Sequence, residues 1–182
     1  VATQYGLSVA YAKMNQKDKA LTAIRAAKAA SKENSVILDK HLAELTYQVA
    51  KTQAQKDQAL ALAKSTCNQY PYSGLAASNY VELLFQSGKH QELVNYLRNQ
   101  SALSRSNPDY HMYLARSYEA LGKKSMAFAA TGDMYALLDN PRAAVYQFEL
   151  AQKANDGDFY IMSEIDAKLR EQRQKVLDQK KD

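Results

Sequence analysis

A regularly spaced set of residues between Pro108 and Ala151 constrains the fold of this chain more than any other feature. In chain order the first set is His111, Leu114, Ala115, Tyr118, Gly122 and Ala127. Small side chains such as Ala115 and Ala127 let two helices cross closely. Gly122 takes the left-handed backbone that ends many helices. The spacing therefore predicts two antiparallel helices joined by a tight turn at Gly122.

The same pattern starts again half a period later, because Tyr135 follows Tyr118 by 17 residues. The second set is Phe128, Thr131, Gly132, Tyr135, Asp139, Ala144, Phe148 and Ala151. The helix near Lys124–Leu138 is thus expected to close one hairpin and open the next. Pro141 suits the first position of the third helix, directly after a turn at residues 139–141.

The period extends over the chain, since Gly88 and Gly122 lie 34 residues apart. This spacing resembles the tetratricopeptide repeat (TPR), whose unit is a helix hairpin of that length. We expect one all-α domain over 1–182, an αα-hairpin solenoid with a C-terminal capping helix. Its repeats are expected at about 1–34, 40–73, 74–107 and 108–154, the last with a shared helix, and its closing helix at 158–180. That helix, N-capped by Asp158, covers the open end of the stack. Within the second repeat the second helix is expected near Lys56–Gln69, and residues 101–107 are expected to form a loop.

Composition agrees with a helical chain. Gly (6) and Pro (3) are scarce, and no run of Val, Ile and Thr alternates with polar residues, so essentially no sheet is expected. Cys67 is the sole cysteine, which excludes an internal disulfide and suits a buried, inert thiol. No apolar run of about 18 residues occurs, so no transmembrane segment is expected. The net charge of +5 comes from charges mixed along helix faces, which makes nucleic-acid binding the weaker hypothesis.

Two segments carry a more specific resemblance. Gln4–Tyr11 reads QYGLSVAY, and Tyr110–Glu171 reads YHMYLARSYEALGKKSMAFAATGDMYALLDNPRAAVYQFELAQKANDGDFYIMSEIDAKLRE. They resemble the C-terminal TPR domain of bacterial M48-family periplasmic metalloproteases, the family that includes the β-barrel assembly-enhancing protease. The resemblance implies a periplasmic location and a role in outer-membrane protein assembly and quality control. Implied partners are a protein or peptide client, such as outer-membrane β-barrel proteins or their assembly machinery.

The zinc motif of that family is absent from this chain. M48 peptidases carry His-Glu-x-x-His, but none of His41, His90 and His111 is followed by Glu-x-x-His. We therefore expect no catalytic residue, no metal ligand and no cofactor here. The resemblance places zinc only in a protease domain preceding Val1, from which this chain is expected to have been cut.

A binding groove is expected on the first helices of the repeats, which line the concave face of such stacks. By repeat position the groove residues are Tyr5, Lys13, Glu82, Phe85, Met112, Arg116 and Glu119. The alternative is that these are ordinary exposed helix residues. A second candidate recognition surface consists of Tyr5, Tyr110, Tyr113 and Tyr146. The tyrosines at signature positions of the repeats are expected in the core: Tyr11, Tyr47, Tyr80, Tyr118 and Tyr135.

Other candidate sites have plainer interpretations. His41 beside Glu44 suits a metal pair less well than a structural pair, and His111 is expected to pack. Asp156 and Asp158 resemble a fragment of a calcium loop, but the later ligands are missing, so a turn is expected. Two other functions remain open: a scaffold or gate that packs on its own protease domain, and a TPR adaptor from an unrelated protein.

Overall fold

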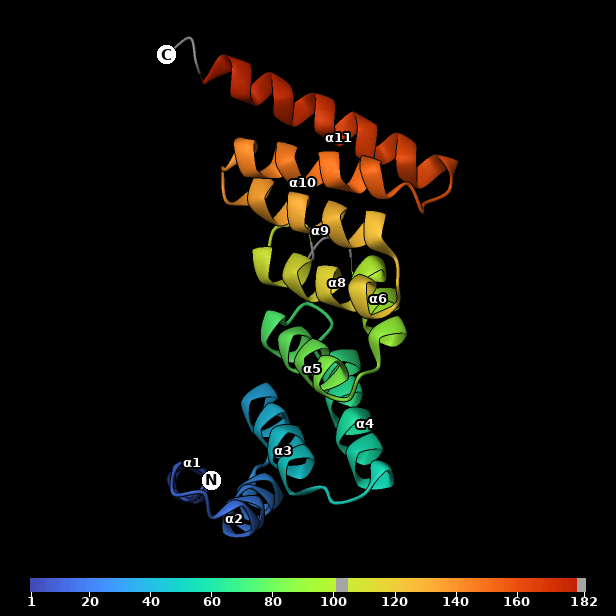
Figure 1. The fold of residues 1–182 in the computed structure, drawn as a ribbon. Helices are drawn as coiled ribbons and strands as arrows, with labels where there is room; N and C mark the ends of the chain where they lie inside the picture. Colours follow the sequence, from blue (N-terminus) through green and yellow to red (C-terminus); the bar gives the residue numbers. More distant parts are fainter. Residues whose placement is uncertain (101–104, 180–182) are drawn as a thin grey trace. The chain divides into compact units, whose positions relative to one another are not determined.

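The structure is a computed structural model that describes residues 1–100 and 105–179. That part of the chain forms helices and no strand (Figure 1). The helices are α1 (Ala2–Lys13), α2 (Lys17–Ala30), α3 (Val36–Val49), α4 (Gln53–Gln69), α5 (Gly74–Gln86), α6 (His90–Asn99), α8 (Pro108–Ala120), α9 (Lys124–Leu137), α10 (Pro141–Ala154) and α11 (Phe159–Asp178). The predicted fold class, an all-α stack of helix hairpins with a closing helix, is confirmed.

The turns lie where the repeat pattern places them. Gly88 and Gly122 have φ of 68° and 73°, and Asn15, at the equivalent position of the first repeat, has φ of 58°. Left-handed backbone of this kind suits Gly and is tolerated by Asn. Asp139, with φ of 52°, makes the turn after the shared helix, as predicted.

One helix begins earlier than predicted. The sequence suggested a start at Lys56, but α4 begins at Gln53 because Thr52 and Gln55 form a capping box. The Thr52 hydroxyl accepts from the Gln55 backbone N–H (3.3 Å), and the Gln55 side chain accepts from the Thr52 N–H (3.2 Å). These bonds satisfy backbone donors that the first turn of a helix leaves open.

The chain divides into two compact units, Val1–Ser87 and Gly88–Asp182. The boundary lies between α5 and α6, the two helices of the predicted third repeat. The single domain over 1–182 stays a prediction. The expected loop 101–107 falls in part outside the described residues, at 101–104, while Asn107 N-caps α8 with its side chain.

In the first unit, each of helices α1 to α5 contacts its neighbours in the sequence, and α3 also contacts α5. The core there joins α2 to α3 and is built of small and branched side chains. Its buried members are Ala20, Leu21, Ile24, Ala27, Leu38 and Leu45.

In the second unit, α8, α9, α10 and α11 follow one another as successive layers (Figure 1). Helix α9 contacts both α8 and α10, which is the shared-helix arrangement expected from the sequence. Helix α11 covers α10, and Ile165 and Leu169 are buried against Phe148. Its Asp158 N-cap is present, with the carboxylate accepting from the Ile161 N–H at 2.9 Å. The predicted closing helix is confirmed as far as residue 178.

The packing of α9 against α10 at Phe148 depends on Gly132. A Cβ atom built on Gly132 lies 2.8 Å from two ring carbons of Phe148, and that ring is only 1% exposed. Ala144 is fully buried on the same helix as Phe148. Small residues therefore set the spacing of these two layers, as the repeat pattern indicates.

Candidate protein-binding groove

A groove of about 700 Å³ lies over helices α8, α9 and α10 in the second unit. Each of the three helices contributes residues to the groove, and α9 lies between α8 and α10. Its apolar lining is made of Met112, Ala115, Ala127, Phe128, Met134, Leu150 and Ala154. Binding sites for peptides and small molecules are typically concave and mostly apolar, with a few polar groups at defined places.

Ala115 and Ala127 account for the depth of the groove. The sequence predicted them at a tight crossing of two helices. Both line the groove and are half-buried, unlike Ala144, which is fully buried. Their short side chains leave open the space that longer residues would fill, so here the small residues of the repeat shape a surface as well as a packing contact.

Four charged side chains line the groove beside this apolar surface: Arg116, Glu119, Lys124 and Lys153. All four are exposed, and within the described residues none of their side chains makes an ion pair or hydrogen bond. Three are positive and one is negative. The groove therefore combines an apolar surface with cationic groups whose charge the described part of the chain does not neutralise.

A second, smaller cavity of about 200 Å³ lies in the same unit. Its basic side chain Lys168, unlike those of the groove, is paired with carboxylates. Lys168 of α11 lies 2.8 Å from an Asp133 oxygen and 2.8 Å from a Glu164 oxygen. Burial lowers the pKa of Lys168, but the two carboxylates outweigh burial and hold that pKa above its ordinary value. The pair with Asp133 joins α11 to α9, whereas the pair with Glu164 lies within α11.

Three of the predicted groove residues, Met112, Arg116 and Glu119, do lie together in the groove on α8. The other four belong to the first unit and do not line it. There, Tyr5 is half-buried with its ring edge-on to His41, and Phe85 is also half-buried. Lys13 and Glu82 are exposed, and Glu82 accepts a hydrogen bond from Gln86. A binding role for these four stays a prediction.

The sequence reasoning missed the half of the groove on α9 and α10. Phe128, Met134, Leu150 and Lys153 were not predicted as groove residues, because only first helices were assigned to the concave face. The doubled pattern contained the missing signal. A helix that is second in one hairpin and first in the next contacts both neighbours, so it also lines a surface with each.

One tyrosine that was predicted on a recognition surface is buried instead. Tyr110 was proposed for a recognition surface, but it is 4% exposed and belongs to the core. Tyr146 is exposed, at 59%, and Tyr113 is half-buried. Of the signature tyrosines, Tyr80 and Tyr118 are buried, and Tyr11, Tyr47 and Tyr135 are half-buried.

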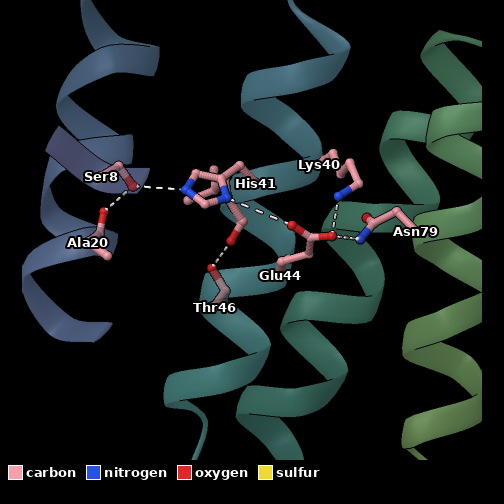
Figure 2. Close-up of polar contacts among 8 residues, drawn as sticks. Ser8, Ala20, Lys40, His41, Glu44, Thr46 and Asn79 are labelled. Atoms are coloured by element: carbon pink, nitrogen blue, oxygen red, sulfur yellow. Dashed lines mark hydrogen bonds and ion pairs between the residues drawn. The ribbon is translucent and has the colours of Figure 1, made fainter. Parts of the chain in front are cut away.

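His41 and Glu44 are engaged in a polar network of the first unit (Figure 2). The buried Ser8 hydroxyl donates to the Ala20 carbonyl (2.7 Å) and so accepts from His41 Nε2 (3.1 Å). On the other side of the ring, Nδ1 lies 3.8 Å from a Glu44 oxygen. These contacts join α1, α2 and α3, which supports the structural interpretation of the pair.

Glu44 extends the same network toward α5. It pairs with Lys40 and accepts from the Asn79 amide at 3.4 Å (Figure 2). Burial raises the pKa of Glu44, but hydrogen bonds and charges from His41 and Lys40 outweigh burial and hold that pKa below its ordinary value. Among the described residues, no three or more His, Cys, Asp or Glu side chains gather as metal ligands.

Asp156 and Asp158 are helix caps. The Asp156 carboxylate accepts from the backbone N–H groups of Lys124 and Ser125, each at 2.7 Å, and so caps α9 from 31 residues away. The Ser125 side chain, then the backbone donors, lower the pKa of Asp156. The turn interpretation is therefore supported, with a capping role that the sequence did not reveal.

No family model and no curated protein matches this chain. Solved structures do. The crystal structure of MamA has a TM-score of 0.62 at 16% identity, covering 97% of this chain and 98% of that one. The MamA RS-1 ArsTM double mutant has a TM-score of 0.65 at 11% identity, covering 96% and 95%.

TTC0263, a thermophilic TPR protein in Thermus thermophilus, has a TM-score of 0.53 at 14% identity, covering 92% of this chain and 98% of that one. The fold is TPR-like. At such low identities the likeness concerns the fold alone. In the described ranges, none of the helices combines the length and the apolar composition that a membrane crossing requires.

Proposed function

We propose that this chain is a non-catalytic protein-binding module whose groove over α8, α9 and α10 holds a segment of another polypeptide. The single observation that supports this best is the apolar surface of Met112, Phe128 and Met134 left open beside unpaired charges. Apolar anchors that enter such a surface supply most of the binding energy, and surrounding polar groups fix the register.

Photo-crosslinking within intact cells tests the proposal. A photoreactive amino acid replaces Met112 or Leu150 in the groove, and in a matched control it replaces Gln174, which is exposed on α11. We expect protein adducts from the two groove positions and none from the control. Equal adducts from all three positions, or none from any, contradict a client site in this groove.

We further propose that the chain belongs to a periplasmic M48-type zinc metalloprotease and brings its clients, outer-membrane β-barrel proteins or their assembly machinery, to that enzyme. Support comes from the residues of Gln4–Tyr11 and Tyr110–Glu171 that resemble this family. The absence of His-Glu-x-x-His from this chain then assigns peptide hydrolysis to another domain.

Two observations test the parentage. The coding sequence before Val1 is expected to contain His-Glu-x-x-His, and the groove adducts are expected to include β-barrel proteins or assembly components. An upstream region without that motif contradicts the protease parent, and a cytoplasmic location of the full protein contradicts the periplasmic assignment. Neither result affects the groove, because its evidence is geometric.

A further inference from the structure

We infer that the groove selects client segments that combine apolar side chains with an excess of carboxylates. This inference rests on the proposed function, since it describes the occupant of the same groove. The charged lining has three cationic groups, Arg116, Lys124 and Lys153, against one carboxylate, Glu119. A partner of the opposite sign is steered toward such a surface and held in register on it.

Three basic side chains of α11, in the same unit, differ from those of the groove because carboxylates of the protein neutralise them. Lys168 is neutralised by Asp133 and Glu164, Arg173 by Glu149, and Lys175 by Glu171. Three of the four basic side chains of α11 thus have acidic partners within the protein, and Arg170 is the exception among the described residues. The three basic side chains of the groove have none among the described residues, so an acidic client would supply the missing partners.

The positions of the charges also give the groove a direction. Lys124 is the first residue of α9 and Lys153 the penultimate residue of α10, and these ends meet where Asp156 bonds to the backbone of Lys124. Met112 lies early in α8 and Met134 late in α9, toward the other end. We therefore expect carboxylates of the client near Lys124 and Lys153, and one of its apolar anchors at the end formed by Met112 and Met134.

Selection from a displayed library of random peptides, each of about a dozen residues, tests the inference on the full chain. Peptides selected by the wild-type protein are expected to be rich in Asp and Glu beside aliphatic or aromatic residues. Replacing the Glu residues of a selected peptide by Gln should weaken its binding about tenfold or more. Added salt should weaken the original peptide and leave the Gln version nearly unchanged.

Two sets of variants complete the design. The triple change Arg116→Glu, Lys124→Glu and Lys153→Glu should remove the acidic preference. The control triple Lys17→Glu, Lys32→Glu and Lys51→Glu alters net charge equally at exposed positions of the first unit and should retain it. Selected peptides without an acidic excess, or Gln versions that bind equally well, overturn the inference.

A different pair of variants tests the proposed function itself. Met112→Asp and Leu150→Asp place a charge in the apolar part of the groove, and circular dichroism verifies that the helices are kept. If selected peptides bind these variants as well as wild type, the groove is not the binding site. If only the Gln comparison fails while these variants lose binding, the groove binds polypeptide and the acidic preference alone is wrong.

Discussion

At the scale of single residues, two glycines inside helices are expected to respond oppositely to the same substitution. Gly132→Ala places a methyl group 2.8 Å from the enclosed Phe148 ring, so it should lower the free energy of unfolding by about 1–3 kcal/mol. Gly6→Ala meets nothing within 4 Å in the middle of α1 and should raise it by about 0.5–1 kcal/mol.

Urea unfolding followed by circular dichroism measures both changes on the same chain. Because each variant gains the same methyl group and the same helix propensity, their difference isolates the contact between α9 and α10. Equal stabilisation by both substitutions would show that Phe148 moves aside freely, contrary to the tight layer spacing described above.

Asp156 should make the free energy of unfolding depend on pH at acidic pH. Its folded pKa is lowered, so the charged form contributes stability above the ordinary value of 3.8, and that contribution is lost as pH falls through the folded pKa. Asp156→Ala removes the cap of α9 and should cost about 0.5–2 kcal/mol at neutral pH. Measured in urea, the gap between wild type and variant should narrow below pH 3.8. A gap that is constant with pH would contradict a charge-dependent cap.

At the scale of helices, the sequence predicted nearly every element because the determinants of helix ends are local. Asn15, Gly88, Gly122 and Asp139 mark turns by their backbone preference alone, and Asp158 marks a start by its side chain. The capping box at Thr52 is equally local, but the sequence analysis did not use it. The predicted start of α4 was therefore three residues too late.

The groove was only half predictable, for a reason that is not local. Met112, Arg116 and Glu119 follow from repeat position on one helix. Phe128 and Leu150 face the same space only because α9 contacts both α8 and α10. Tyr110 was misplaced for a similar reason, since its burial depends on the packing around α8 rather than on its own spacing.

Two leucines of the closing helix should differ sharply in what they contribute. Leu169 is 1% exposed in the core that α11 shares with α10, so Leu169→Ala should lower the free energy of unfolding by about 2–5 kcal/mol. Leu177, 53% exposed on the same helix, should change it by less than about 0.5 kcal/mol when replaced by Ala. Thermal unfolding of the two variants gives the comparison. Similar losses would mean that α11 does not close the stack through the buried contacts of Leu169.

At the scale of the whole molecule, the two units are expected to open separately. Repeat proteins unfold as neighbouring elements whose coupling depends on the contacts between them, and amide hydrogen exchange resolves such partial openings. The test uses Leu169→Ala, which weakens the core of Gly88–Asp182. Slowly exchanging amides of Phe148 and Ala151 should then lose protection by the same free energy that unfolding measures. Those of Ala20, Ile24 and Leu45 in the core of Val1–Ser87 should exchange as in the wild-type protein. An equal loss in both sets would show that the two units unfold together, in agreement with the single domain over 1–182 that the sequence predicted.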